Sequence, residues 1–296
     1  MTEVAARTVA NRHPGDGRLL GWILVAAAAT AWSLGGFFIR LIDENIFTIL
    51  FWRGVFSGTA ILFLFFYLEG SRAIITLRGL RWPTVQAALG SAVSMVCGMT
   101  AVHFTSVAEA LIIYCLVPFI TAAGAWLVIS ERASRATMIA SGIALVGISI
   151  MMWGAALGGS LFGNLLAFGM AAGMAWMTIV LRQHRDVPMF PAMSLSAYMA
   201  AGFSATLAPS LMMTPLNFAY TAAFGVVQNA AGLVLFAIGA RRISAAEAAL
   251  IAVLEVPLGT LWVWLFFAET PRPSALVGGA VVLAAVIGHV LIEARR

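Results

Sequence analysis

The chain has 296 residues, of which 62% are hydrophobic and only 10% are charged, and its formal net charge is +5. Soluble domains carry about 45–50% apolar and about 25% charged residues, so this composition excludes a soluble globular protein. The 17 basic residues are all arginines dispersed along the chain, and this pattern does not indicate a nucleic-acid-binding surface.

Ten predominantly apolar runs follow one another, each long enough for a helix that crosses a bilayer, which needs about 20 residues. They lack the alternating polarity of membrane β-strands. The sequence therefore predicts an all-α polytopic membrane protein with ten transmembrane helices, preceded by a cytoplasmic tail at 1–18. The expected spans are 19–39, 47–68, 84–103, 107–129, 135–154, 161–181, 190–211, 218–240, 244–267 and 273–292.

The arginines predict the orientation of the chain, because basic residues concentrate in cytoplasmic loops. With a cytoplasmic N-terminus, fourteen of the 17 arginines fall in cytoplasmic segments. Arg40 and Arg272 fall on the other side, and Arg53 lies inside a span. Both termini are therefore expected to be cytoplasmic.

The first three spans carry side chains that could line a solute pocket. Trp32 lies within the first span, and Met95 and Met99 lie in the third. Aromatic and apolar walls are typical of small-molecule sites, although such residues also pack without a ligand. Arg53 lies near the outer end of the second span. An ion pair with the acidic residues 43–44 explains it structurally, and attraction of a substrate carboxylate explains it functionally.

The fourth span opens with SVAEALIIYCLVP, residues 106–118. Ser-x-x-Glu is the capping box, which satisfies free amides at a helix N-terminus. Glu109 is therefore interpreted first as part of a helix start, with gating as the alternative. Pro118 predicts a kink, and Tyr114 is a candidate pocket residue. Glu131, at the end of this span, is expected to brace the short connection to Arg135.

Spans six to eight add four candidates for the same pocket. Trp176 occupies a position in the sixth span similar to that of Trp32 in the first, and Tyr198 lies in the seventh. Gln228 and Asn229 lie in the eighth. They also give Glu255, described next, a structural explanation, in which its protonated carboxyl is hydrogen-bonded to Gln228 or Asn229.

The ninth span opens with SAAEAALIAVLEVP, residues 244–257. Glu247 repeats the capping box, and Pro257 repeats the kink. Glu255 lies eleven residues beyond Ser244, about 16 Å deep at 1.5 Å per residue. An acid at the middle of a bilayer is costly and usually faces a cavity or a partner. Glu255 is therefore predicted to contact a substrate ammonium or to carry a proton, and Trp262 lies two turns further along the same face.

The similarity of the two stretches indicates an internal repeat. The halves 19–154 and 161–296 each contain five spans, and an odd number means that they enter the membrane from opposite sides. Inverted repeats of this kind are common in secondary transporters, with the site between the halves. Val117 stands in the first half where Glu255 stands in the second, so the fold itself does not require the acid.

Together these features resemble the drug/metabolite transporter superfamily, in its ten-helix branch with two EamA-type halves. The residues that carry the resemblance are Trp32, Arg53, Pro118, Glu131, Gly142, Pro257, Glu269 and Gly279. Tyr114 and the LEVP sequence are most similar to the aromatic amino-acid exporters. The second half departs from the pattern, because Leu195 stands near the place that corresponds to Arg53.

The resemblance implies a secondary transporter that exports aromatic or other amino acids across the bacterial inner membrane by alternating access. Its central cavity would be lined mainly by helices 1, 3, 4, 6, 8 and 9. A multidrug or quaternary-ammonium exporter is the alternative, and an intramembrane lipid enzyme or a structural subunit ranks below both. No nucleotide-binding loop or hydrolase motif is found in the sequence. We expect no enzyme activity, no cofactor and no metal. The protein is expected to be a monomer, with a dimer as the alternative. The sequence leaves open whether protons are the coupling ion.

Overall fold

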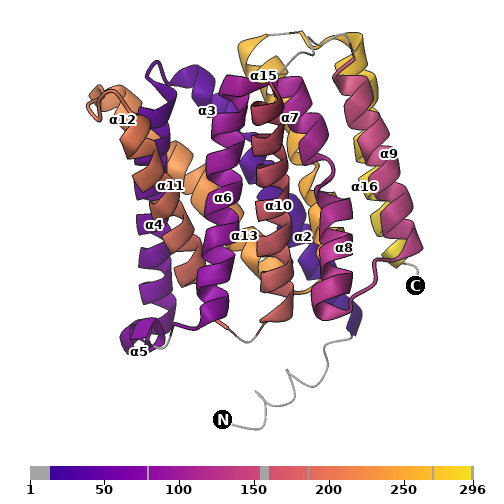
Figure 1. The fold of residues 1–296 in the computed structure, drawn as a ribbon, viewed down its shortest axis with the longest axis horizontal. Helices are drawn as coiled ribbons and strands as arrows, with labels where there is room; N and C mark the ends of the chain where they lie inside the picture. Colours follow the sequence, from indigo (N-terminus) through magenta and orange to yellow (C-terminus); the bar gives the residue numbers. More distant parts are fainter. Residues whose placement is uncertain (1–13, 79, 154–159, 186, 269, 295–296) are drawn as a thin grey trace.

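The computed structural model describes residues 14–78, 80–153, 160–185, 187–268 and 270–294. Figure 1 shows helices standing side by side as one layered bundle, with the start of α2 and the end of α16 at the same end of it. We call this the terminal end. The helices of the first half are α2 (Pro14–Ser33), α3 (Gly35–Leu41), α4 (Ile46–Glu69), the 3₁₀ turn η1 (Gly70–Arg72), α5 (Ala73–Arg78), α6 (Trp82–Phe104), α7 (Val107–Tyr114), α8 (Val117–Ile129) and α9 (Arg135–Met151).

The second half repeats this order with helices of similar length. Its elements are α10 (Leu161–Gln183), α11 (Phe190–Leu207), α12 (Pro215–Ala223), the π-helix η2 (Phe224–Ala230), α13 (Ala231–Gly239), α14 (Ala245–Ala252), α15 (Glu255–Phe267) and α16 (Pro273–Ala294). Several starts follow the expected chemistry: Ser134, Ser160 and Ser244 each accept a hydrogen bond from the amide three residues ahead, as helix caps do.

Within the described residues, eight helices are long and apolar enough to cross a membrane, and no residue is in a β-strand. Helix α9, with 17 residues, is apolar but shorter, and α11 is not among the eight. The protein is thus an all-helical, multi-pass membrane protein. The predicted total of ten crossings includes α9 and α11, which stand alongside the eight in the bundle (Figure 1).

Most of the helix packing joins the first half to the second. Helix α13 packs on α2 as α10 packs on α6, η2 packs on α4 as α11 packs on α6, and α15 packs on α2 as α8 packs on α10. Helices α4 and α11, α8 and α14, and α9 and α16 pair directly. Several of these pairs therefore correspond when the helices of the two halves are exchanged, whereas the α8–α14 pair has no counterpart of similar extent between α7 and α15.

Glycines allow the paired helices to approach closely. A Cβ atom added at Gly173 of α10 would lie 2.6 Å from the carbonyl oxygen of Gly90 in α6. One added at Gly278 of α16 would lie 2.3 Å from the carbonyl oxygen of Gly147 in α9. In a bilayer, helices associate through close packing of small residues rather than through the hydrophobic effect. These positions therefore hold the two halves together.

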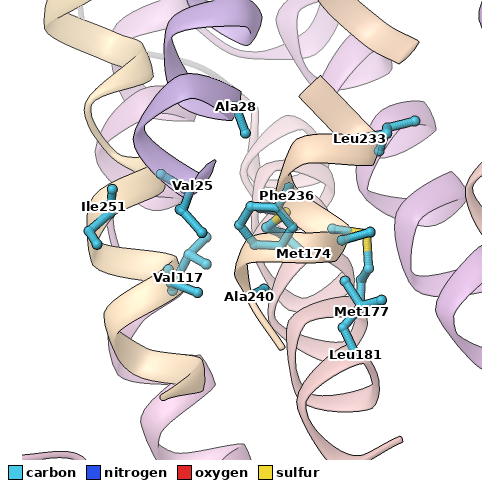
Figure 2. Close-up of a cluster of buried hydrophobic side chains, with 14 of the residues drawn as sticks. Val25, Ala28, Val117, Met174, Met177, Leu181, Leu233, Phe236, Ala240 and Ile251 are labelled. Atoms are coloured by element: carbon cyan, nitrogen blue, oxygen red, sulfur yellow. The ribbon is translucent and has the colours of Figure 1, made fainter. Parts of the chain in front are cut away.

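The largest buried apolar cluster lies in the half of the bundle next to the termini. Figure 2 shows its centre, where side chains from α2, α8, α10, α13 and α14 meet. Phe236 is fully buried there, and Val117 packs in the same cluster with 1% of its surface exposed. The other buried clusters are smaller. The bundle is thus packed most extensively toward its terminal end.

Candidate functional site

Two spans are interrupted at corresponding places, one in each half. Helix α7 ends at Tyr114, and α8 begins at Val117 with Pro118 as its second residue. Helix α14 ends at Ala252, and α15 begins at Glu255, with Pro257 two residues later. Proline cannot donate the hydrogen bond that would continue the helix. Val117 and Glu255 therefore occupy the same position, the first residue after each break.

Two further spans are irregular at similar depth. The first is broken between α2 and α3 at Leu34. The eighth contains the π-helix η2, which carries Gln228 and Asn229, and such segments are frequent at functional sites. Irregular backbone is tolerated at membrane depth where it is buried in protein or lines a cavity. These segments form one connected group, which we call the mid-membrane cluster: Ser33, Arg53, Tyr114, Gln228, Glu255 and Trp262.

Glu255 lies in this cluster as a half-buried side chain at the break of its span. The hydroxyl of Tyr114, from the corresponding break in the first half, is its hydrogen-bonding neighbour. The positive charge of Arg53 also acts on the carboxylate, although the two form no ion pair in the structure. The two broken helices thus bring a phenol and a carboxylate together between the halves.

Arg53 and Gln228 form the second part of the cluster. Nη1 of Arg53 donates to Oε1 of Gln228 at 3.2 Å, and Nε2 of Gln228 donates to the carbonyl oxygen of Trp32 at 3.1 Å. The structure therefore does not give Arg53 the predicted ion pair with residues 43–44. Arg53 is buried in the bundle, with 5% of its surface exposed, and its hydrogen bond to Gln228 leads to a helix 175 residues away.

The amides and acids that were expected as partners bind elsewhere. Asn217 donates to the backbone carbonyl of Asp43 and to the carboxylate of Glu44. Asn229 donates to the hydroxyl of Ser57 at 2.9 Å. Gln228 is engaged as described above. The alternative in which Gln228 or Asn229 holds the carboxyl of Glu255 is therefore wrong for this conformation.

The predicted aromatic residues divide into two groups. Trp262 donates from its indole nitrogen to the hydroxyl of Ser33 at 2.8 Å, which joins α15 to the end of α2. Trp32 is 9% exposed and packs on Phe236 at 5.2 Å between ring centroids. Both therefore border the mid-membrane cluster.

The other two aromatic residues lie apart from this cluster in the described contacts. Trp176 is 37% exposed on α10, where it lies beside Gly90 of α6. Tyr198 shares a hydrogen bond of 2.8 Å with Thr59 on the seam between α4 and α11. No described contact connects either of them to Glu255.

A narrow crevice reaches Arg53 from between α4, α6 and α11. Met95 and Met99 border it, together with Phe203 and Ser204. Its volume is about 10 Å³, which is room for about one water molecule. This crevice is not the wide cavity expected among helices 1, 3, 4, 6, 8 and 9. In this conformation the crevice at Arg53 is too narrow to admit a solute.

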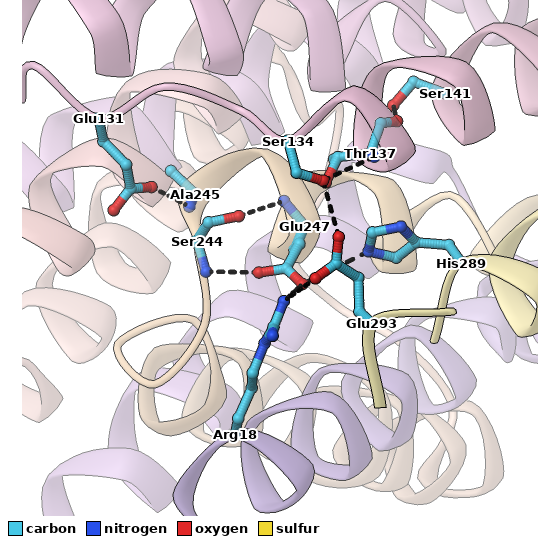
Figure 3. A network of polar contacts seen from close by, with 10 residues as sticks. All are labelled: Arg18, Glu131, Ser134, Thr137, Ser141, Ser244, Ala245, Glu247, His289 and Glu293. Carbon is cyan, nitrogen blue, oxygen red and sulfur yellow. Dashed lines mark hydrogen bonds and ion pairs between the residues drawn. The ribbon is translucent and has the colours of Figure 1, made fainter. Parts of the chain in front are cut away.

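The predicted capping box at Glu247 is present, and it belongs to a larger network at the terminal end (Figure 3). Arg18 donates to Glu247 and to Glu293, at 2.8 Å in each case. Nε2 of His289 lies 3.4 Å from the carboxylate of Glu247, and Ser134 donates to Glu293 at 2.9 Å. We call these residues, with Ser244 and Glu131, the terminal-end network.

The terminal-end network corrects the expected role of Glu131. Instead of bracing Arg135, its carboxylate binds Nε of Arg182 at 2.7 Å and accepts the amide of Ala245 at 2.8 Å. Both contacts lead from the first half to the second. The predicted counterpart, Glu269, lies outside the described residues.

The capping box at Glu109 is only half formed. Ser106 accepts the amide of Glu109 at 3.1 Å. The carboxylate of Glu109, however, meets the hydroxyl of Thr105, which also contacts the side-chain oxygen of Asn164 in α10. The two matched glutamates therefore lie at opposite ends of the bundle. The described contact of the Glu109 carboxylate is with Thr105, whereas Glu247 contacts Arg18 and His289.

Sequence reasoning missed Arg18, His289 and Glu293 as a group. They lie near the ends of the chain, and Glu293 is 275 residues from Arg18. One signal was available: an acid in the last turn of a helix is unfavourable unless a cation is close. Glu293 in the last turn of α16 therefore indicated a cationic partner, although not which one.

Broken helices around a half-buried carboxylate, within a bundle whose two halves pack on each other, are typical of a membrane protein through which a solute passes. The EamA-like transporter family matches residues 19–153 and again residues 161–291. The chain belongs to this family, and so to the drug/metabolite transporter superfamily, as the sequence predicted.

The chain is also similar to one curated protein and shares its fold with a solved structure. An uncharacterized transporter of Archaeoglobus fulgidus is 24% identical over 252 residues, which cover 84% of this chain and 88% of that protein. A solved crystal structure superposes with a TM-score of 0.79 at 17% identity, over 95% of this chain and 99% of the other. That structure bears on the fold alone. The family and the archaeal relative point to a transporter rather than an enzyme.

Proposed function

We propose that the protein is a secondary transporter that exports small amino-containing metabolites, with aromatic or other amino acids as the substrates, across the bacterial inner membrane. The observation that carries the proposal is the position of Glu255. It is a carboxylate at mid-depth, at the break of a membrane-spanning helix and beside the phenol of Tyr114. A buried acid in a spanning segment marks a substrate or proton pathway by default.

The proposed mechanism is alternating access between two inverted halves of five helices, with both termini in the cytoplasm. The helix pairs that correspond between the two halves support it, and so do the breaks at corresponding places. The contacts of Arg18 and Glu131 all cross from one half to the other at the terminal end. In the proposed cycle these contacts close the cytoplasmic side, and they separate when that side opens.

The first prediction tests Glu255 by transport. Purified protein in proteoliposomes is given radiolabelled phenylalanine, tryptophan and alanine, with and without a pH gradient. Saturable uptake is expected for the wild type. Glu255→Gln should lower kcat/KM about tenfold or more, because a hydrogen bond to a charged group contributes about 1.5–3 kcal/mol. The same change at Glu69, which ends α4, is the control and should leave uptake unchanged.

The alternative is a multidrug or quaternary-ammonium exporter, since Glu255 and the ring of Trp262 also suit a lipophilic cation. Benzyltrimethylammonium is the probe. Uptake of this cation without uptake of any amino acid would overturn the amino-acid proposal. Uptake of amino acids at the wild-type rate by Glu255→Gln would assign Glu255 a structural role. A response of wild-type uptake to the pH gradient would identify protons as the coupling ion.

A further inference from the structure

Arg53 is a buried cation without an acidic partner at contact distance. It lies seven residues beyond the start of α4, about 10 Å along the helix axis at 1.5 Å per residue, and it is 5% exposed. No described carboxylate lies within ion-pair distance of it. Arginine inside a membrane protein is costly and is normally paired. Its placement therefore calls for an explanation.

The contacts of Arg53 leave part of its guanidinium unused. The group has five N–H donors, and the structure gives it one hydrogen bond, from Nη1 to Gln228. Nε is buried without any partner. The ring of Phe224 lies 5.2 Å from the guanidinium carbon and covers one of its faces. Buried donors of a charged group that lack hydrogen bonds cost free energy. An anion that accepted these hydrogen bonds would therefore bind this guanidinium favourably.

The surroundings hold Arg53 in place for that anion. Gln228 cannot turn its oxygen away without losing the bond from its Nε2 to the carbonyl of Trp32. The crevice between α4, α6 and α11 is lined in part by Arg53, so a water molecule has room beside this residue on that side. The negative charge of Glu255 acts on Arg53 from within the cluster without direct contact.

We propose that Arg53 binds the carboxylate of the transported solute, so that the site recognises a zwitterion through two opposite charges. This inference rests on the proposed function and specifies its substrate class. Arginine presents a planar fork that matches a carboxylate in two parallel hydrogen bonds. Glu255 takes the ammonium group at the other end of the solute. Arg53 also repels a lipophilic cation, which lacks the carboxylate that would neutralise it.

The second prediction tests this inference with matched solutes. Uptake is measured for phenylalanine and for phenylethylamine, which is the same molecule without its carboxylate, and for alanine and ethylamine as a smaller pair. The wild type should prefer each amino acid. Arg53→Gln should lower kcat/KM for the amino acids about 30-fold or more, the effect expected when one partner of a buried charge pair is removed. Uptake of the amines should fall little or rise.

Two controls separate recognition from folding. Arg40→Gln makes the same change at an exposed arginine in α3 and should leave the preference unchanged. Gln228→Glu places a carboxylate beside Nη1 of Arg53, where an ion pair preserves the packing. This internal anion should abolish the preference for amino acids while the protein keeps its wild-type elution in size-exclusion chromatography.

The outcomes distinguish this inference from the proposed function. If the wild type takes up phenylalanine or alanine and neither Arg53→Gln nor Gln228→Glu changes the preference over the amine, only the role of Arg53 is overturned. If the wild type takes up benzyltrimethylammonium and no amino acid, the proposed function fails together with it. A preference that is lost in both variants and kept in Arg40→Gln supports the assignment.

Discussion

At the scale of single residues, the matched stretches 106–118 and 244–257 differ because equivalent positions have different surroundings. Val117 and Glu255 each begin a helix after a break. Val117 is buried in the main apolar cluster, whereas Glu255 lies beside Tyr114 in the mid-membrane cluster. The backbone of the break is thus common to both halves, and the acid belongs to one of them.

The third prediction concerns Arg18, the cation that two buried carboxylates share. Arg18→Gln leaves Glu247 and Glu293, which are 3% and 6% exposed, without that charge. Loss of one partner of a fully buried pair costs about 3–5 kcal/mol. The side chain of Arg18 is 35% exposed, so screening by solvent reduces the expected loss of unfolding free energy to about 1–3 kcal/mol.

Denaturation of the purified protein in detergent measures this loss. Arg242→Gln is the matched control, because Arg242 is exposed and lies just after α13, where it bonds the carbonyl of Ile238 in the last turn of that helix. It should change the unfolding free energy by less than about 0.5 kcal/mol. Equal stability of the two variants would mean that the terminal-end network contributes nothing to holding the halves together.

Single residues also show what the sequence can and cannot predict. Glu255 was identified because a lone acid in an apolar span is conspicuous and its depth follows from helix geometry. The partner of Arg53 was mispredicted because the nearest acids in sequence were chosen, whereas Gln228 lies 175 residues away on η2. Pairings between distant helices depend on which faces meet, and hydropathy does not encode this.

At the scale of elements, close helix pairs depend on glycines that the sequence alone does not distinguish from others. Gly278 and Gly288 both lie in α16. A Cβ atom at Gly278 would lie 2.3 Å from the carbonyl oxygen of Gly147, whereas one at Gly288 would have no neighbour within 4 Å. The same residue type on one helix therefore has a packing role at one place and none at the other.

The fourth prediction follows from this contrast. Gly278→Ala should lower the unfolding free energy by about 1–3 kcal/mol, the usual effect of adding a methyl group to a tightly packed interface. Gly288→Ala should be neutral or slightly stabilising, because alanine favours a helix more than glycine does. Denaturation in detergent compares them, and a Gly278→Ala variant as stable as Gly288→Ala would contradict the close packing of α9 on α16.

The positions of the helices were predicted better than the breaks and irregular turns within them. Helices occur at all ten expected runs, because apolar length predicts helices in membranes directly. The break at Leu34 and the π-helix η2 were not predicted. Neither contains proline, so each depends on contacts with neighbouring helices: Gln228 of η2 bonds the carbonyl of Trp32 beside Leu34.

At the scale of the whole molecule, the two ends of the bundle are packed unequally. The main apolar cluster and the terminal-end network both lie toward the termini. The crevice at Arg53 lies in the other half, between α4, α6 and α11. We infer that the interior is more accessible to water at this crevice than in the main apolar cluster.

The fifth prediction tests this difference with one substitution at two sites. In a variant without Cys97 and Cys115, Met99→Cys places a thiol at the crevice and Met174→Cys places one in the main apolar cluster. A hydrophilic maleimide should label the Met99→Cys protein several times faster, because the thiol at position 174 is excluded from water. Equal labelling rates would contradict the greater accessibility of the crevice to water.

The unequal ends have a consequence for the energies of the two conformers. Exchanging the halves of a symmetric repeat would convert each conformer into the other, so a backbone of this kind gives them nearly equal free energies. The side chains described around the two matched glutamates differ, with Thr105 beside Glu109 and Arg18 and His289 beside Glu247, and such divergence removes that degeneracy. A difference of a few kcal/mol reduces the minor state to about 0.1–10%. The resting population is therefore determined by the side chains in which the halves have diverged, and substitutions there would shift it without altering the path between the states.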